Sequence, residues 1–384
     1  MNNHFDCLVI GGGVLGTFHA YHAMKRGLKV ALIEKGRRPQ GATVRNFGQV
    51  VPSGMDRKWQ QYGRESLRIY NELQSQIDLT IRNEGTIYFA SDEEEETLLV
   101  ELSEINKQEN YASRILSRQE CLKQYPGLKS DYVRAGLYFP EELIIEPEVM
   151  INRLQDYLAE KGVDIYFGTL ALSCDVNGGK VEVACAGNKN FTANKVIICN
   201  GSDLDTLFPE IFAQSDLEVV KLQMMQTVPQ RNFNIKGAVL SGLSVRRYES
   251  FRECPSYRLI NEKEDVDSQV KKWGVHILFK QALDGSVIIG DSHHYATPTK
   301  QDELGFDLDM DIDEFIMKEA RRIYELPDDR IKYRWYGVYV QCSQKDIFQK
   351  TIDQHIHIVT GIGGKGMTGS AGFSKAHIDH ILNQ

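Results

Sequence analysis

The chain has 384 residues, with 45 Lys and Arg against 53 Asp and Glu, so its formal net charge at pH 7 is −8. Hydrophobic residues make up 42% of the sequence, which excludes a disordered chain, and the length allows two or three domains. The net negative charge argues against nucleic acid as a partner. The 7 cysteines are dispersed without a CxxC pair, so we expect no metal site, no disulfide framework and a cytoplasmic location.

The N-terminus carries a nucleotide-binding pattern. Residues 5–10 predict a buried strand, residues 14–26 predict a helix, and the turn between them begins a spaced set of glycines, Gly11, Gly13 and Gly16. The first glycine allows a tight turn, the second lets the backbone approach a pyrophosphate, and the third lets the helix pack on the strand. Residues 7–24 contain no Asp, Glu, Lys or Arg, but their glycines and histidines argue against a membrane span.

A second predicted strand, residues 28–34, ends at Glu34. A carboxylate at this point accepts hydrogen bonds from ribose hydroxyls and disfavours a 2′-phosphate, so NADP is the least favoured dinucleotide. The strand–helix alternation of a plain NAD dehydrogenase does not continue after Glu34. Instead, residues 36–55 form a loop rich in glycine and small polar residues, and residues 56–77 predict an amphipathic helix. A loop that can run beside a flat ring favours FAD.

A second glycine-rich unit stands at the C-terminus. Residues 356–360 predict a strand, residues 361–368 a glycine-rich turn, and residues 369–383 a helix. The N-terminus of such a helix is an anion site, and Lys365 adds a positive charge to it. Two such units at opposite ends of one chain predict a single long dinucleotide, FAD.

The middle of the chain, residues 216–345, contains no further nucleotide motif. It predicts mostly strands, at residues 217–228, 237–251, 272–281 and 285–295, with a hairpin turn at 284–286 and a helix near 311–324. An acidic run at residues 92–96 follows Ser91, and we interpret Ser91 and Glu94 as the capping box of a helix rather than as a metal or protein patch.

Together these segments resemble the D-amino-acid oxidase (DAO) family of FAD-dependent amine oxidoreductases, which includes the glycine and sarcosine oxidases. The resemblance covers essentially the whole chain and implies an α/β fold (α+β overall): a Rossmann-like FAD-binding domain with an antiparallel-sheet substrate domain, as in the glutathione-reductase-like fold. It places the FAD-binding domain at residues 1–80, 141–215 and 346–384, and the substrate-binding domain at 81–140 and 216–345. The stretches RNFGQVVPSGM, LSVRRYESF, IGDSHHY and GIGGKGMT also resemble a bacterial branch associated with aminophosphonate breakdown.

The resemblance, together with the glycine patterns, gives a set of expected FAD contacts: Gly11, Gly13, Val14, Leu15, Gly16, Glu34, Lys35, Thr43, Arg45, Asn46, Phe47, Gly48, Ala171, Asn200, Gly201, Gly337, Gly363, Gly364, Lys365, Gly366, Met367 and Thr368. The sequence departs from the sarcosine oxidases at three places. No cysteine stands at 335–337, where their flavin is tethered, so we expect non-covalent FAD. Thr368 replaces their carboxylate-binding lysine, and Ile288 lies near their oxygen-assisting lysine, so the electron acceptor is either oxygen or unknown.

The reaction that the resemblance implies is hydride transfer to flavin N5 from the carbon that bears the amine of a small amine or amino acid. The substrate's acidic group then needs an anchor, for which arginine is favoured. The expected substrate-binding residues are Arg45, Arg247, Tyr248, Arg258 and Arg334, and the catalytic candidates are His293, His294 and Lys365.

Three alternatives remain open. A 2-hydroxy acid dehydrogenase of the same fold would use His293 or His294 as the base for the hydroxyl group. An RNA-modifying flavoprotein is disfavoured by the net charge of −8. A non-catalytic subunit that keeps FAD for structure predicts that no small amine or hydroxy acid bleaches the flavin.

Overall fold

The strand–turn–helix unit at the N-terminus forms where the sequence predicts it. In the computed structural model, which describes residues 4–383, β1 (His4–Ile10) leads through the glycine turn into α1 (Val14–Lys25). β2 (Val30–Ile33) then pairs with β1 in parallel. All four residues of β2 are buried, as expected for a parallel strand that is covered on both faces.

Eight strands of the described chain form the first sheet, in the order β18–β19–β11–β1–β2–β8, and β10 and β9 extend from β11. The strands from β19 to β8 run parallel, whereas β18 is antiparallel to β19. The bounds of the other members are β8 (Asp164–Tyr166), β9 (Ala171–Asn177), β10 (Lys180–Cys185), β11 (Lys189–Ile198), β18 (Phe348–Ile352) and β19 (Ile356–Thr360).

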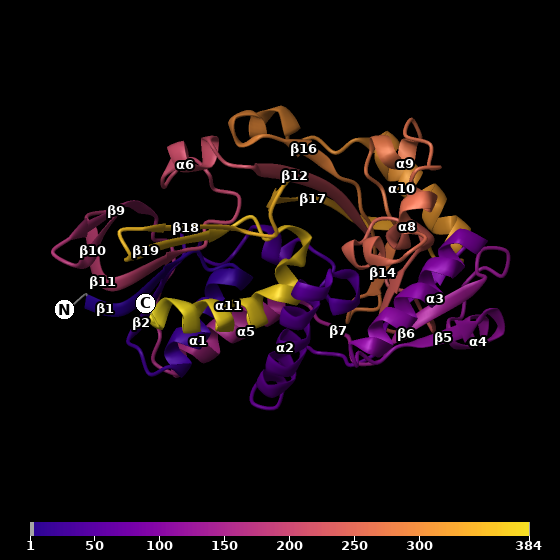
Figure 1. The fold of residues 1–384 in the computed structure, drawn as a ribbon, viewed down its shortest axis with the longest axis horizontal. Helices are drawn as coiled ribbons and strands as arrows, with labels where there is room; N and C mark the ends of the chain where they lie inside the picture. The colour runs from indigo at the N-terminus through magenta and orange to yellow at the C-terminus, as the bar shows by residue number, and fades with distance from the viewer. Residues whose placement is uncertain (1–3, 384) are drawn as a thin grey trace.

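The two faces of this sheet are buried against different elements. Cys7 and Val9 of β1 point into a core with α1 and three further helices, α2 (Arg57–Gln74), α5 (Pro147–Glu160) and α11 (Gly366–Leu382). The alternate residues Leu8 and Ile10 point into a second core with the β9–β10 hairpin. Figure 1 shows α1 and α11 lying side by side below the sheet, so the two ends of the chain form one layer.

Nine strands from the described residues form the second sheet, in the order β16–β12–β15–β14–β13–β4–β6–β5, and β17 pairs with β12. Most pairs are antiparallel, and β12 and β17 are paired along their whole lengths. The bounds are β4 (Thr86–Ala90), β5 (Arg114–Ser117), β6 (Ala135–Phe139), β12 (Leu217–Thr227), β13 (Ala238–Leu240), β14 (Leu278–Gln281), β15 (Val287–Gly290), β16 (His294–Ala296) and β17 (Ile331–Cys342).

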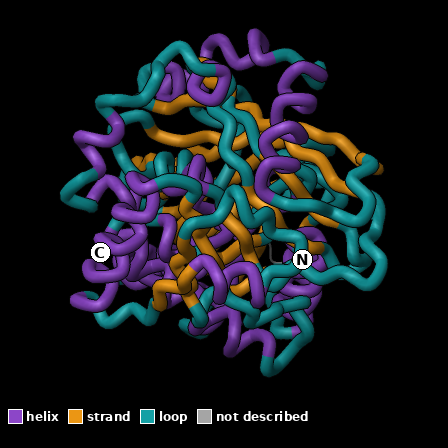
Figure 2. The backbone as a smooth tube through the Cα atoms, turned by 90° about the vertical axis from the view of Figure 1, so that its right-hand side faces the viewer, coloured by secondary structure: helices purple, strands orange, loops and turns teal. Residues whose placement is uncertain are grey.

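The remaining elements are short connections and outer helices. They are β3 (Gln49–Val50), β7 (Leu143–Ile144), α3 (Glu93–Gln108), α4 (Arg118–Gln124), α6 (Pro209–Ala213), α7 (Gly242–Val245), α8 (Tyr257–Asn261), α9 (Gln269–Lys272) and α10 (Met310–Ile323). From the side, the strands occupy the interior and most helices lie outside them (Figure 2). None of the helices within residues 4–383 has the length and apolarity that a membrane crossing needs. The mixed α/β fold class is confirmed.

Two local expectations are wrong, and one segment has an additional role. The strand predicted at 237–251 ends at Leu240, and the chain then turns into α7 and a 3₁₀ helix, Glu249–Glu253. The helix cap lies one residue later than predicted, since the Asp92 side chain accepts a hydrogen bond from the Glu95 amide. The acidic run also binds Arg246, whose guanidinium forms ion pairs with Asp92 and Glu95.

A buried ion pair joins the two halves of the molecule. Glu146, at the start of α5, lies 2.7 Å from Nζ of Lys280 on β14 and 3.0 Å from the guanidinium of Arg82 (both measured to Oε1). The Lys280 side chain is completely inaccessible to solvent, and burial lowers the pKa of its ammonium group to about 8. Its charge therefore depends on Glu146 for compensation.

Candidate active site

A single long cavity of about 1060 Å³ runs from the first sheet to the second. Both glycine-rich turns line it, together with the loop that follows β2 and residues of β12, β14 and β17. Every expected FAD contact lines this cavity except Gly16 and Gly48. The fold therefore brings segments more than 300 positions apart in the sequence together around this cavity.

Gly16 and Gly48 shape the cavity wall from behind. A Cβ atom on Gly16 would lie 2.0 Å from the carbonyl oxygen of Gly11, so the helix approaches the turn as closely as only glycine permits. Gly48 has φ of +73°, and a Cβ atom there would lie 2.2 Å from the Ile145 carbonyl oxygen. These two glycines hold the neighbouring segments in place rather than face the cavity.

The Glu34 carboxylate lines the cavity at the end of β2. Its Oε2 accepts a hydrogen bond from the Gly12 amide at 2.8 Å, and its Oε1 accepts one from the Gly36 amide at 2.7 Å. The Val14 amide donates to Thr43 Oγ1 at 2.9 Å, which ties the second loop to the glycine turn. These contacts fix a carboxylate at the end of β2, where it can also accept from a ribose.

The C-terminal glycine turn lines the cavity at the N-terminus of α11. A Cβ atom on Gly364 would meet no atom within 4 Å, and the buried Oδ1 of Asn200 has no hydrogen-bond partner among residues 4–383. Open space beside exposed backbone and an unsatisfied buried acceptor both fit a bound dinucleotide.

Lys365 lies in this turn but is already paired. Its Nζ donates to Glu249 Oε1 at 2.9 Å and lies 5.5 Å from the centre of the Trp59 ring. Glu249 therefore neutralises the charge that the sequence assigned to the anion site.

Arg247 and Tyr248 line the far end of the cavity, under the second sheet. The Arg247 guanidinium donates to the Tyr295 hydroxyl at 2.9 Å, and within the described chain it forms no ion pair. Arg45 also lines the cavity. Its guanidinium donates to the backbone carbonyls of Gln40 and Tyr336 and so stabilises the loop of residues 36–55.

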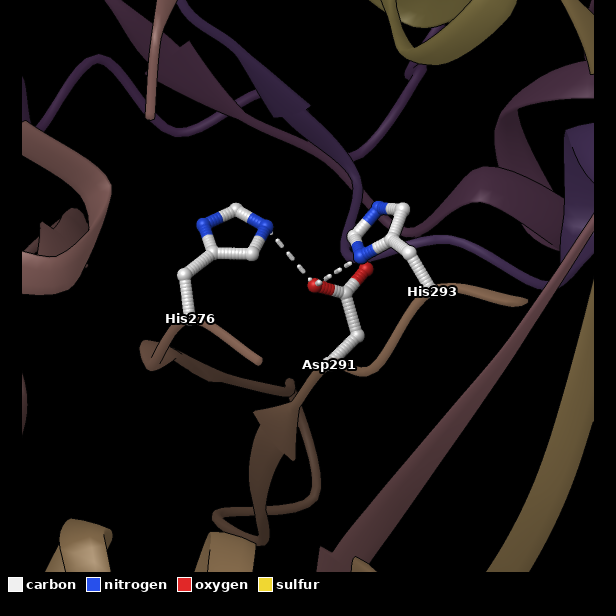
Figure 3. Close-up of side chains that lie close together, drawn as sticks. All are labelled: His276, Asp291 and His293. Atoms are coloured by element: carbon white, nitrogen blue, oxygen red, sulfur yellow. Dashed lines mark ion pairs between the residues drawn. The ribbon is translucent and has the colours of Figure 1, made fainter. Parts of the chain in front are cut away.

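His276, Asp291 and His293 form a buried group on the same wall (Figure 3). Asp291 Oδ1 lies 2.8 Å from His276 Nε2 and 4.0 Å from His293 Nδ1. Ser244 Oγ lies 3.2 Å from His276 Nδ1, and His293 Nδ1 lies 3.0 Å from the Gly274 carbonyl oxygen. A carbonyl oxygen only accepts, so Nδ1 of His293 carries the hydrogen, and Nε2 is left as the basic nitrogen.

Burial sets the charges of this group. It lowers the pKa of His293 to about 3, against the opposing charge of Asp291, and it also lowers the pKa of His276. Burial alone would raise the pKa of the Asp291 carboxyl, but His293, His276 and Arg247 outweigh it, so that pKa lies below its usual value. At neutral pH the group is therefore one carboxylate between two neutral imidazoles.

Three predicted residues lie outside the cavity, which corrects their assignment. Arg258 is on the surface, where it forms an ion pair with Glu262 one helical turn later. Arg334 binds Asp313 of α10 at 2.9 Å. His294 is absent from the cavity wall because successive residues of β16 point to opposite faces.

Four residues that were not predicted from the sequence also line the cavity: His276, Asp291, Tyr295 and Tyr339. Asp291 and Tyr295 stand in the stretch IGDSHHY, whose polar residues directly after an apolar strand were a usable signal. His276 lies among apolar residues before β14, and only the pairing of β14 with β15 brings it to Asp291.

A parallel sheet with two glycine-rich turns on one long cavity, covered by an antiparallel sheet, is the architecture of a flavin dinucleotide oxidoreductase. The chain belongs to the DAO family of FAD-dependent oxidoreductases, whose pattern matches residues 6–379. The protein is accordingly an FAD-dependent enzyme, and the expected family is confirmed.

Three similar proteins illustrate the range of this family. A glycerol 3-phosphate dehydrogenase of Caloramator mitchellensis is 24% identical over 99% of this chain and 74% of its own length. A glycine oxidase of Bacillus licheniformis is 25% identical over 55% of this chain, and the match spans 58% of that enzyme. The FAD-bound L-α-glycerophosphate oxidase of Mycoplasma pneumoniae has the same fold, with a TM-score of 0.79 and 17% identity over 99% of this chain and 95% of its own.

Proposed function

We propose that the protein oxidises a small amine or amino acid that carries an acidic group, with Arg247 as the anchor for that group. The observation that carries this proposal is the state of Arg247: it lines the cavity, and no carboxylate of the described residues pairs with it. A guanidinium in a cavity wall without a counter-ion is suited to a carboxylate or phosphonate of the substrate. An aminophosphonate is therefore among the expected substrates.

FAD would occupy the cavity between Glu34 and the second sheet. The residues proposed to hold it are those of the two glycine turns that line the cavity, the loop from Thr43 to Phe47, and Ala171, Asn200, Gly201 and Gly337. Residues 1–80, 141–215 and 346–384 would then form the FAD-binding domain, and residues 81–140 and 216–345 the substrate domain. When bound, FAD supplies the acceptor for the hydride equivalent; we propose that it is held without a covalent bond.

The protein's own residues would orient the substrate and manage its protons. Arg247 and the Tyr295 hydroxyl fix the acidic end. His293 is neutral at pH 7 and offers its unprotonated Nε2 as a hydrogen-bond acceptor for an N–H of the amine. The aromatic side chains around the histidines exclude water from the reacting carbon.

A second candidate is the oxidation of a hydroxyl group, in a 2-hydroxy acid or a polyol phosphate. The unprotonated Nε2 of His293 fits it as a hydrogen-bond acceptor for the hydroxyl group, although the low pKa of this ring makes it a weak base. The similarity to a glycerol 3-phosphate dehydrogenase over 99% of the chain points the same way.

Anaerobic mixing with a substrate panel tests the proposal. N-methyl amino acids, D-amino acids, aminophosphonates, 2-hydroxy acids and glycerol 3-phosphate would each be added to the purified yellow protein while flavin absorbance is followed. Bleaching by amines supports the proposal, and bleaching only by hydroxy compounds overturns it in favour of the second candidate. Bleaching by none of them would indicate the non-catalytic alternative.

Arg247→Ala tests the anchor. Removing a charge-assisted contact of about 1.5–3 kcal/mol should weaken substrate binding by roughly 10- to 150-fold. Arg258→Ala, which removes an exposed arginine outside the cavity, is the matched control and should bind substrate as the unaltered protein does. Equal affinities for both variants would remove Arg247 as the anchor.

A further inference from the structure

Asp291 is a buried carboxylate that forms no ion pair with a Lys or Arg of residues 4–383. Its side chain is 10% exposed, and His276, whose Nε2 lies 2.8 Å from Oδ1, is its partner on this wall. Arg247 lines the same cavity, but its hydrogen bond goes to Tyr295 and it forms no ion pair with Asp291. An unpaired buried carboxylate costs free energy, so this position favours a cationic guest.

The groups closest to Asp291 are neutral, and its charge is balanced only by the more distant Arg247. Burial keeps the pKa of His276 and of His293 below the usual value, so both rings are neutral near pH 7. The nearby phenols of Tyr248 and Tyr339 are neutral as well, because burial raises the pKa of each. Arg247 is therefore the cation whose field reaches Asp291 from this wall.

Aromatic rings form a connected group on the same cavity wall as the carboxylate. The ring centres of His276 and Tyr248 lie 5.5 Å apart, those of His276 and His293 5.4 Å apart, and that of His293 lies 6.4 Å from Tyr339. The faces of phenol rings attract ammonium groups. The attraction extends to N-methylated ammonium groups, because it does not require a hydrogen bond. Such walls suit an alkylated amine better than a hydroxyl group.

We propose that Asp291 is the cation subsite of the cavity: its carboxylate binds the ammonium group of the substrate, N-methylated forms included, while Arg247 binds the acidic group at the other end. The inference rests on the proposed function and deepens it. The two opposite charges select a zwitterion over a 2-hydroxy acid, which offers Asp291 a hydrogen bond from an uncharged hydroxyl group but no positive charge.

A divalent metal is the competing occupant. One ligand atom each from His276, Asp291 and His293 lies within 4.8 Å of the others, a spacing that metal sites share. The positive charge of Arg247 on the same wall opposes a dication. A zwitterion instead brings its own anion to Arg247, so the observations favour the ammonium group.

Two inert probes of equal shape test the subsite on the FAD-loaded protein. Trimethylglycine has a quaternary ammonium group and is not oxidised as an amine, and 3,3-dimethylbutanoate is its neutral carbon analogue. Their dissociation constants would be measured by calorimetry or by perturbation of flavin absorbance. We expect trimethylglycine to bind at least about tenfold more tightly, from the combined carboxylate and ring attraction.

Variants assign that preference to its source. Asp291→Asn should abolish the preference and leave binding of 3,3-dimethylbutanoate unchanged or improved, and Asp291→Glu should retain it. Asp313→Asn, which alters a buried aspartate paired with Arg334 outside the cavity, is the matched control and should also retain it. Equal binding of the two probes to the unaltered protein overturns the proposal even if the Asn variant fails to fold.

Other outcomes separate the explanations. A preference that persists in Asp291→Asn would refute the role of the carboxylate. Micromolar binding of Zn²⁺ alone, lost in Asp291→Asn, would identify a metal site instead. Bleaching by amines without a probe preference leaves the proposed function intact and removes only the subsite; bleaching only by hydroxy compounds removes the function itself.

Discussion

Replacing Glu146 with glutamine should strongly destabilise the protein, because it strips the counter-charge from a lysine that solvent cannot reach. Lys280 Nζ lies 2.7 Å from the Glu146 carboxylate and its side chain is 0% exposed. Removing one partner of such a buried pair costs about 3–5 kcal/mol, since the remaining charge stays desolvated. Arg82, 3.0 Å from the same oxygen, adds repulsion once the carboxylate is gone.

Urea unfolding of the FAD-loaded protein at pH 7, followed by circular dichroism, measures this loss. Glu72→Gln is the matched control: it removes a carboxylate from a surface pair with Arg68 that is worth about 0.2–1 kcal/mol. Because the pKa of Lys280 is about 8, the lysine is mostly neutral by about pH 9, and the penalty should shrink there. A loss no larger than that of the control, or one equal at both pH values, would refute the reasoning.

Three further predictions concern acid stability and the cofactor. Burial lowers the pKa of His19 and His22 to about 4 and that of His377 to about 2, so these rings are neutral when folded but bind protons below their usual value of 6.5 when unfolded. Their contribution to the free energy of unfolding is complete above pH 6.5 and falls as the pH drops, by up to about 1.4 kcal/mol per pH unit for each ring. Urea titrations measure this, and a free energy of unfolding that does not change between about pH 5 and 6.5 would contradict it. Gly16→Ala should destabilise the turn by about 1–3 kcal/mol and weaken FAD binding, measured by fluorescence titration of the apoprotein; tight binding would disprove the close approach. Acid precipitation should release all the yellow colour into the supernatant; colour that stays in the pellet, and is released when Cys342 of the cavity wall is changed to serine, would show a covalent flavin.

The nucleotide-binding parts were predictable because their signals are local. The first unit, from β1 through α1 to β2, needs only hydrophobic periodicity and glycine spacing, and so does the unit of β19 and α11. The surface position of Arg258 was also within reach, since Glu262 four residues later on a helix is a usual partner.

The substrate end depends on contacts that no local pattern encodes. His276 and Asp291 come together because their strands pair. Arg334 forms an ion pair outside the cavity with Asp313, which lies twenty-one positions earlier in the sequence, on another element. The error at 237–251 has a similar origin, because residues after Leu240 pack as short helices over the cavity although their apolar content suits a strand. Long-range packing therefore determines which polar residues line the substrate end of the cavity. Local sequence patterns are enough to predict the nucleotide-binding segments.

The position of α11 against α1 has a consequence for how the protein is made. β19 pairs with β11, and α11 packs on α1 and α2, so the segment from Ile356 to Leu382 completes a layer that the first residues begin. A chain still being synthesised exposes the apolar faces of these early elements until α11 has left the ribosome. Folding of this half is therefore expected to be slow and to wait for the synthesis of α11, with FAD incorporated only after that helix has emerged. A nascent chain halted before Ile356 should bind no flavin and should be a ready client for chaperones.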